Sequence, residues 1–504
     1  MGKQKINKTY NLKEIIIKSV IVIGVLLVFY QFFINRSLWR DEAKLALNII
    51  NKSPAELLKP LDYLQVGPIL FLQIEKYFSR LVPNSEYGLR LFPLIAYLVS
   101  LGFFYKIIRH LHKNYYTIVL ALSLFVFNAT LIYYSSEVKQ YMADVLVLTA
   151  IYYILIRKYK NENYKYFILG AVGSVGVFLS NVAPIVLLTA GLYLFYENFK
   201  AKKKQLPVMV ISFVWIVTFL IYFFGFIHNH PLRSGMLKFW SLNNGFLPTN
   251  PFSYEFYEFL VFKVNMILKM NGSTAMLPIF HRAQDSFIAL DFFLLIFVLV
   301  GFFQLFKKRK INILILLVTP IAIHLLLSGL KIYPFDTRML LYTCPLIIII
   351  SSFGFQAIAK VAFIKFKKEK FALLAVVMPL FMGCLLYIES GFPIENVELK
   401  KSLSYLNENI KQEDKVFLSR AVQPAYQYYE QTSFISINAS RLVFEKNVST
   451  HSVGFLNELG NLSGRVWFIF DSDFQYPISY FNTIGLNPIE FYEAHGSSIY
   501  LYDL

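Results

Sequence analysis

Two adjacent carboxylates stand at the end of a long apolar segment. Asp41 and Glu42 lie in the run SLWRDEA (residues 37–43), which follows directly after residues 15–34. Charged groups are costly to place at the mouth of a membrane helix, so these acids need an explanation. A carboxylate in such a place can accept the proton of an attacking hydroxyl, which makes Asp41 a candidate general base. The structural alternative is that one of the two acids caps a helix over residues 43–50.

Polar residues also gather where a later apolar segment begins. Glu137, Tyr141 and Asp144 are spaced four and seven residues apart, so a helix through all three would carry them on one face. An ionisable residue one or two turns inside a membrane span is expected to face a polar cavity. The alternative is a helix capped by Ser135 or Ser136, with Glu137 in a first turn where the helix dipole favours an acid. Both interpretations stay open.

Two arginines stand at the starts of other apolar segments. Arg90 opens one of them, and Arg338 closes the run YPFDTR, which begins at Tyr333. Either guanidinium could neutralise a phosphate or simply reach the lipid headgroups, and Arg338 could instead pair with Asp336. The neighbours His281-Arg282 are a weaker candidate, because a lone histidine in a loop is more often incidental.

The composition places these residues in a membrane protein. Hydrophobic residues make up 56% of the 504 residues, charged residues make up 16%, and the chain contains 50 Phe and 34 Tyr. A soluble protein of this composition would expose too much apolar surface. The net charge of +18 indicates basic cytoplasmic loops rather than nucleic-acid binding, because the basic clusters lie between apolar segments. Cys344 and Cys384 also lie within apolar segments, and their spacing fits neither a disulfide nor a metal site.

Segments of about 20 apolar residues predict membrane-spanning helices. The first is expected to be retained, because it is long enough to span and lacks a signal-peptide cleavage site. A tight reversal at residues 180–184, which include Pro184, separates the fifth span from the sixth. The eleven predicted spans are 15–34, 89–107, 116–132, 141–156, 165–181, 182–197, 207–227, 287–306, 311–330, 338–357 and 372–389.

The charges of the connecting loops predict the orientation of these spans. Lys and Arg cluster after every even-numbered span, whereas the short loops 133–140, 180–184 and 331–337 are nearly free of them. Cytoplasmic loops collect such charges, so we expect a cytoplasmic N-terminus and a location in the plasma (inner) membrane. The chain is rich in Lys, Asn and Ile, a composition that suggests a bacterial source and agrees with that location. The external segments are then 35–88, 228–286 and the tail 390–504.

The external segments contain structure of their own. Apolar periodicity predicts surface helices over 43–50 and 69–81. The tail alternates helices and strands, which predicts a small α/β domain with a largely parallel sheet. Its Asp471 and Asp473 follow a strand, where two acids usually form a turn. We therefore predict a mainly α-helical membrane module, 1–389, and an external α/β domain, 390–504.

Several of these motifs together resemble a known family. The Trp39-x-Asp41-Glu42-Ala43 element, the loop with two surface helices and the pattern E-x-x-x-RLFP (residues 86–93) are similar to the protein mannosyltransferase and aminoarabinose transferase type (glycosyltransferase family 39-like) of GT-C glycosyltransferases. The run YSSEVKQY (134–141) is similar to a second signature, and Tyr333-Pro334 with Arg338 to a later one. The resemblance covers roughly residues 15–355. The run 64–68 departs from it, because the family often has a basic residue or His before paired prolines there.

The resemblance implies a membrane-helical GT-C bundle that transfers a sugar from a polyprenyl-phosphate donor to a lipid, glycan or protein acceptor on the external face. Asp41 would be the general base, Glu137 would bind a sugar, and Arg338 would counter the lipid phosphate. A base opposite the leaving group implies inversion at the sugar carbon. The metal requirement varies within such enzymes, and because no decisive ligand set is present, no metal or other cofactor is assigned. The remaining expected substrate-binding residues are Glu42, Arg90, Tyr141 and Tyr333.

Two other classes of protein stay open at this point. A lipid or glycan transporter would need polar or broken helices near the membrane midplane, whereas the predicted span centres are apolar apart from His324 and a few glycines. A transporter would also work without Asp41. A structural or binding protein that presents the tail outside would need only that tail.

Overall fold

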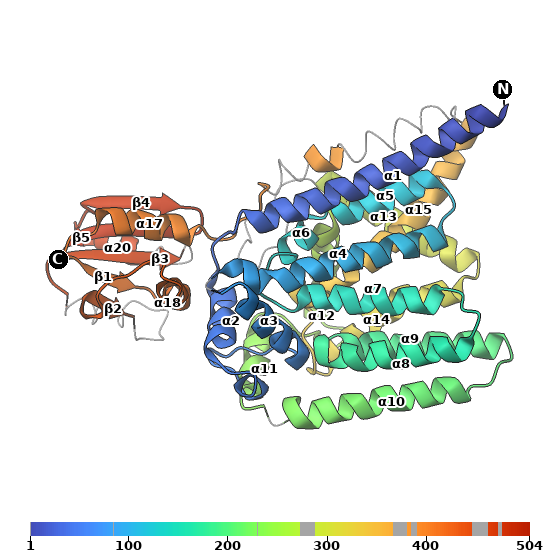
Figure 1. Cartoon of the computed structure of the whole chain (residues 1–504), viewed down its shortest axis with the longest axis horizontal. Helices are drawn as coiled ribbons and strands as arrows, with labels where there is room; N and C mark the ends of the chain where they lie inside the picture. Colours follow the sequence, from blue (N-terminus) through green and yellow to red (C-terminus); the bar gives the residue numbers. More distant parts are fainter. Residues whose placement is uncertain are drawn as a thin grey trace.

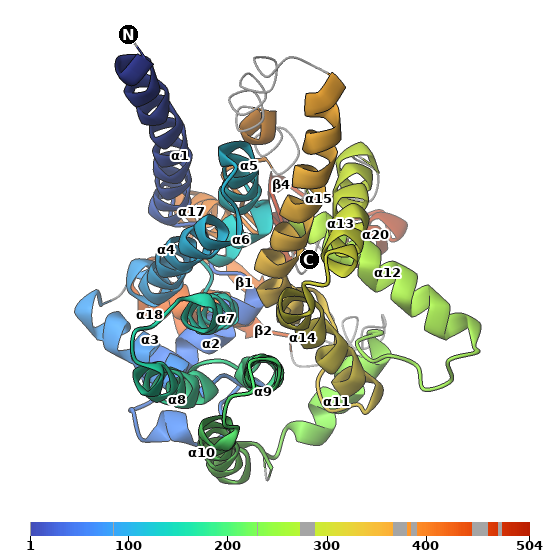
Figure 2. The same ribbon diagram turned by 90° about the vertical axis from the view of Figure 1, so that its right-hand side faces the viewer.

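A bundle of long helices carries a small sheet domain at one end (Figure 1). The computed structural model describes residues 2–83, 85–228, 230–272, 288–365, 381–384, 391–445, 462–471 and 476–504. The helices of the bundle run side by side, and the sheet domain lies beyond the end where α2 and α3 pack together. Figure 2 views the bundle from its opposite end.

The first ten predicted spans all coincide with helices. The eleventh, 372–389, falls largely outside the described residues, so the count of eleven is not confirmed. Within the described residues, five helices are long and apolar enough to cross a membrane: 12–33, 86–111, 206–227, 311–329 and 337–361. The helices of the bundle are α1 (Gly2–Phe33), α4 (Glu86–Leu111), α5 (Tyr115–Val126), α6 (Ala129–Tyr134), α7 (Tyr141–Ile156), α8 (Glu162–Leu179), α9 (Ala183–Lys200), α10 (Leu206–Tyr222) with η2 (Phe223–Ile227), α13 (Ile288–Lys307), α14 (Ile311–Gly329), and η3 (Thr337–Thr343) running into α15 (Cys344–Lys365).

Local sequence explains two breaks between these helices. The reversal predicted at 180–184 is confirmed, because α8 ends at Leu179 and α9 begins at Ala183 with a proline in its first turn. The third predicted span is not continuous, since α5 ends before Asn128. The Asn128 side chain accepts the amide of Leu131 at 2.8 Å and donates to the carbonyl of Met270 at 2.9 Å. It thereby caps α6 and breaks the helix.

Amphipathic helices cover the end of the bundle nearest the sheet. The predicted surface helices are confirmed as α2 (Arg40–Asn51) and α3 (Ile69–Leu81), which η1 (Glu56–Leu58) separates. Because α2 begins at Arg40, Asp41 and Glu42 lie inside its first turn rather than at its N-cap, which is Trp39. The capping alternative is therefore wrong. The second of the loops predicted to be external, 228–286, contains α11 (Arg233–Leu242) and α12 (Tyr254–Asn271).

The tail folds around a five-stranded sheet of order β2-β1-β3-β5-β4. Only β2, β1 and β3 are parallel, whereas β5 runs antiparallel to both β3 and β4. The prediction of a largely parallel sheet was wrong because β4 and β5 form a tight hairpin through His495 and Gly496, whose φ of +70° suits glycine. The elements of the tail are α17 (Leu399–Asn409), β1 (Lys415–Leu418), α18 (Gln423–Gln431), η4 (Ala439–Arg441), β2 (Leu442–Phe444), β3 (Arg465–Asp471), α20 (Tyr476–Thr483), β4 (Glu490–Ala494) and β5 (Ser497–Asp503).

The sequence pattern also predicts a strand over residues 434–438, and the structure has none there, for a local reason. The backbone amides of Phe434 and Ile435 both donate to the carbonyl oxygen of Tyr429, at 2.8 and 3.4 Å. Since these amides close the end of α18, they cannot pair with a neighbouring strand. Asp471 ends β3, and Asp473 lies outside the described residues.

The tail is bonded directly to the segment that carries the candidate base. The amide of Leu38 donates to the Tyr429 hydroxyl at 2.7 Å, and both partners are buried. Gln31 exchanges two hydrogen bonds with the backbone of Ile394, at 2.7 and 2.9 Å. Lys400 pairs with Glu86 at 2.6 Å. The sheet domain therefore fixes the chain between α1 and α2.

We predict that Tyr429→Phe loosens this segment. The change leaves the buried Leu38 amide without an acceptor, which costs about 1–3 kcal/mol. Hydrogen exchange followed by mass spectrometry should show faster exchange around residue 38. Tyr63→Phe is the matched control, because the Tyr63 hydroxyl bonds Gln427 at an exposed position. Equal protection of residue 38 in both variants would show that the Tyr429 contact is unimportant.

Candidate active site

Asp41 and Arg338 meet at the end of the bundle that carries the sheet domain. The Arg338 guanidinium donates to Asp41 Oδ2 at 3.0 Å, although the two residues are 297 positions apart. Their side chains are 22% and 16% exposed, so the pair is partly accessible to solvent. Burial by itself would raise the pKa of Asp41, but the charges of Lys139 and Arg338 hold this pKa well below its ordinary value. Asp41 is therefore ionised and accessible.

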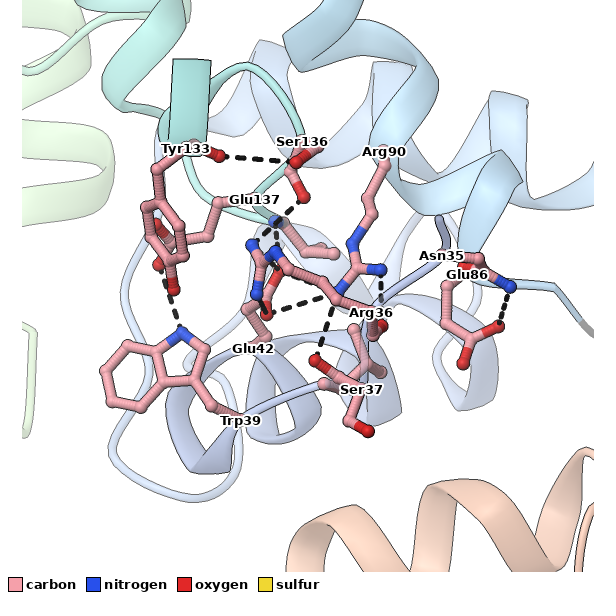
Figure 3. A network of polar contacts seen from close by, with 12 residues as sticks. Asn35, Arg36, Ser37, Trp39, Glu42, Glu86, Arg90, Tyr133, Ser136 and Glu137 are labelled. Atoms are coloured by element: carbon pink, nitrogen blue, oxygen red, sulfur yellow. Dashed lines mark hydrogen bonds and ion pairs between the residues drawn. The ribbon is translucent and has the colours of Figure 1, made fainter. Parts of the chain in front are cut away.

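Glu42 points the other way, into a buried network of charges (Figure 3). Arg36 contacts its carboxylate at 2.7 and 3.2 Å, and Arg90 contacts both oxygens at 3.3 Å. The amide of Val138 donates to the same carboxylate at 2.9 Å. Burial would raise the pKa of Glu42, yet the two guanidinium groups lower it. With side chains 0–1% exposed, the predicted substrate-binding residues Glu42 and Arg90 lie in the interior and hold the site together.

Arg36 completes this network, and the sequence analysis did not single it out. Its guanidinium donates to the carbonyl of Ser136 at 3.1 Å and stacks 4.3 Å from the centre of the Tyr133 ring. Its own carbonyl accepts from Arg90 at 2.7 Å. The available signal was its position, directly after a predicted span and five residues before Asp41. In sequence, a buried and paired cation at this position looks the same as one that only reaches the lipid headgroups.

Glu137 lies in the turn between α6 and α7 rather than on a helix. The prediction that it shares a helix face with Tyr141 and Asp144 was wrong, because α7 begins only at Tyr141 with Gln140 as its N-cap. The capping alternative is wrong for the same reason. Trp39 donates its indole N–H to Glu137 Oε1 at 3.2 Å, while Oε2 is buried without a partner. Burial and the nearby charge of Glu42 raise the pKa of Glu137 to about 8.

Lys139 is the second functional candidate that the sequence analysis missed. It is buried and donates to Gln65 Oε1 at 2.7 Å. Burial lowers the pKa of Lys139 to about 8, against the opposing effect of the Asp41 charge. Gln65 lies in the run 64–68 that departs from the family pattern, so a lysine from another loop reaches the place where that run lacks a basic residue. The signal was a lone cation in a predicted external loop that is otherwise free of Lys and Arg.

The segment that leads to Arg338 is held by histidine and lysine contacts. The Nε2 atom of His324 lies 2.9 Å from the carbonyl oxygen of Pro334, and its ring packs against Tyr333 with centroids 5.0 Å apart. Lys263 pairs with Asp336 at 2.6 Å. Asp336 is thus paired with Lys263, and Arg338 is directed toward Asp41.

The remaining candidates make contacts of their own. Tyr141 is buried and packs edge-on against Tyr134, with ring centroids 5.4 Å apart. Asp144 accepts a hydrogen bond from Ser180 at 2.6 Å. His281-Arg282 lie outside the described residues. Across the described ranges, no group of three or more His, Cys, Asp or Glu side chains is arranged to hold a metal ion.

Comparison with known proteins bears on the family and the fold of the chain. Residues 66–222 match the family model described as dolichyl-phosphate-mannose-protein mannosyltransferase. No curated protein matches the chain. ArnT from Cupriavidus metallidurans, solved bound to undecaprenyl phosphate, is similar over 95% of this chain and 97% of its own, with 10% identity and a TM-score of 0.51.

Two further structures give similar values. ArnT in the apo state covers 96% of this chain and 98% of its own, with 11% identity and a TM-score of 0.49. The archaeal oligosaccharyltransferase AglB from Archaeoglobus fulgidus, in complex with an inhibitory peptide and a dolichol-phosphate, covers 96% of this chain and 74% of its own, with 12% identity and a TM-score of 0.49.

The family match and the fold shared with undecaprenyl-phosphate-bound ArnT confirm the predicted resemblance to GT-C glycosyltransferases. The expected enzyme class, a glycosyltransferase, is confirmed with it. ArnT is one protein that this chain is similar to in fold.

We predict unequal effects on stability for two isosteric changes in the network. Glu42→Gln leaves two buried guanidinium groups without their counter-charge, and breaking a buried pair in this way costs about 3–5 kcal/mol. Glu137→Gln should change the free energy of unfolding by less than about 1 kcal/mol, because Glu137 is already largely protonated near neutral pH. Denaturant titration in detergent measures both. Equal losses would mean that Glu42 is not the charge on which the network depends.

Proposed function

We propose that this chain transfers a sugar from a polyprenyl-phosphate donor to an acceptor hydroxyl on the external face of the membrane, with Asp41 as general base. The observation that carries the proposal is the accessible Asp41–Arg338 pair, at 3.0 Å, at the mouth of an apolar bundle. A lipid-linked donor suits this position, because its chain can stay in the bilayer while its phosphate reaches the mouth. The undecaprenyl phosphate bound to ArnT supports a donor of this class.

The charges around Asp41 suit the two halves of the reaction. Displacement at the anomeric carbon passes through an oxocarbenium-like state, which a carboxylate on the acceptor side stabilises. The departing polyprenyl phosphate carries negative charge, which preorganised cations stabilise. We assign that role to Arg338 and Lys139. A base on the face opposite the leaving group implies inversion at the sugar carbon.

The ion pair also suggests how donor binding prepares the base. While Arg338 pairs with Asp41, the low pKa of Asp41 makes this carboxylate a weak proton acceptor. A donor phosphate would compete for Arg338 and Lys139, and each cation drawn away raises the pKa of Asp41. The carboxylate would then be a stronger base only when the donor is in place, which limits unproductive hydrolysis.

The remaining site residues have supporting roles in this proposal. Glu42 and Arg90 fix the start of α2 from the buried side and so position Asp41. Glu137 and Tyr141 line the inner approach and bind a sugar hydroxyl, while Tyr333 holds the segment before Arg338. Residues 1–389 form the catalytic membrane module with a cytoplasmic N-terminus in the plasma membrane, and 390–504 form the external domain. The acceptor class, lipid, glycan or protein, stays open.

We predict that Asp41→Asn lowers the turnover number about 10²–10⁴-fold, because a general base contributes about that much. The assay uses full-length protein in lipid nanodiscs with a labelled polyprenyl-phosphate sugar and mixed cell-envelope acceptors, and it follows release of polyprenyl phosphate. Asp62→Asn is the control, since Asp62 is an exposed acid of the same loop that pairs with Lys52. Full activity of the Asp41 variant, together with movement of label across the bilayer, would favour a transporter instead.

We predict that Lys139→Gln lowers kcat/KM for the donor about 10-fold or more, because it removes a charge-assisted contact to the phosphate. Lys44→Gln removes a cation 4.0 Å from Asp41 on the more exposed side and should change kcat/KM about twofold at most. Steady-state kinetics over donor concentration separates the two. Equal losses of kcat/KM in both variants would show that any nearby positive charge has this effect and that Lys139 does not contact the phosphate.

A further inference from the structure

A basic cavity lies at the end of the bundle away from the sheet domain. Its volume is about 490 Å³, and it opens between the last turns of α4 and the end of α7. These two helices pack along their length, and Figure 2 faces the end of the bundle where the cavity opens. Its lining contains no acidic residue. It includes five basic side chains, those of Lys106, Arg109, Lys113, Arg157 and Lys158.

The positive charge in this cavity is largely uncompensated. Arg109 pairs with Glu14 at 2.8 Å. For the other four cations, the described part of the chain offers no carboxylate within ion-pair distance. Lys106 and Arg157 instead lie over one ring, that of Tyr153, at 5.2 and 5.9 Å from its centre. Like charges gathered around one aromatic ring repel each other, and an anion bound among them would relieve that repulsion.

The surroundings favour an anion that carries an apolar chain. A second, smaller cavity of about 110 Å³ shares two lining residues with the first, His110 and Ile156. Most of its lining is apolar, including Leu111 and Leu316. A polar cavity that adjoins an apolar one at the end of membrane helices matches the two parts of a phospholipid.

We propose that this cavity binds the phosphate headgroup of an anionic membrane lipid, with the start of an acyl chain entering the apolar cavity beside it. The phosphate would contact Lys106, Arg157 and Lys158, and the tyrosine ring of Tyr153 would pack against the glycerol backbone. The site lies at the opposite end of the bundle from Asp41 and is independent of the transfer reaction. The alternative is that these basic residues are attracted to the negative membrane surface without binding any one lipid. That alternative does not account for a cavity between the helices.

The test compares two triple variants of the full-length protein with the same loss of charge. The cavity variant is K106Q/R157Q/K158Q, and its matched control removes exposed lysines of the neighbouring α9–α10 loop, K200Q/K202Q/K204Q. Native mass spectrometry measures binding of phosphatidylglycerol to each protein, with phosphatidylcholine and inorganic phosphate as the comparison ligands. Thermal unfolding in detergent establishes that both variants are folded.

The proposal expects phosphatidylglycerol to bind the wild-type protein more tightly than phosphatidylcholine. The cavity variant should lose about 10-fold or more in affinity, and the control variant about twofold at most, since each cation near a headgroup contributes measurably. Equal losses in the two variants would overturn the proposal in favour of general surface charge. Binding of inorganic phosphate as tight as that of the lipid would also overturn it, because the apolar cavity would then contribute nothing.

Discussion

The end of the bundle nearest the sheet domain depends on one buried carboxylate enclosed by two guanidinium groups. Desolvating Glu42, Arg36 and Arg90 is costly, and leaving any of them unpaired would cost considerably more. The three charges come from the start of α2, the segment before it and the first turns of α4, and the amide of Val138 adds the turn before α7. These four segments stay together because separating any one of them would leave a buried charge without its partner.

This constraint explains why two carboxylates stand next to each other at residues 41 and 42. Successive residues on a helix point about 100° apart, so when Glu42 is drawn inward, Asp41 must face the mouth. Two neighbouring carboxylates thus occupy different environments, and Glu137, buried beside them with a raised pKa, occupies a third. One acid is a structural anion, one is an accessible anion, and one is largely protonated near neutral pH. Separated pKa values of this kind are typical of sites that divide acid and base roles.

Sequence patterns predicted most of the architecture but only part of the site. Apolar periodicity located helices at the first ten predicted spans and at both predicted surface helices. The resemblance led to Asp41 and Arg338, which the structure brings into contact. Lys139 was missed because its partner lies 74 positions away along the chain. Arg36 was missed although Glu42 is only six positions away, because its other contacts, with Arg90 and Ser136, span 54 and 100 positions. A single cation in a loop looks the same whether it pairs or is solvated. Spacing also placed Glu137 on a helix, since a turn and a helix cannot be told apart over three residues.

The bond between Leu38 and Tyr429 has a consequence for how the protein is made. The chain emerges from the ribosome N-terminus first, so Asp41 is synthesised long before the tail exists. The segment before α2 receives the Tyr429 hydroxyl as a hydrogen-bond partner only after α18 has been synthesised and folded. A nascent chain therefore holds an incomplete site throughout its insertion. The sheet domain sets the moment at which the site becomes ordered, without contributing an atom to the Asp41–Arg338 pair.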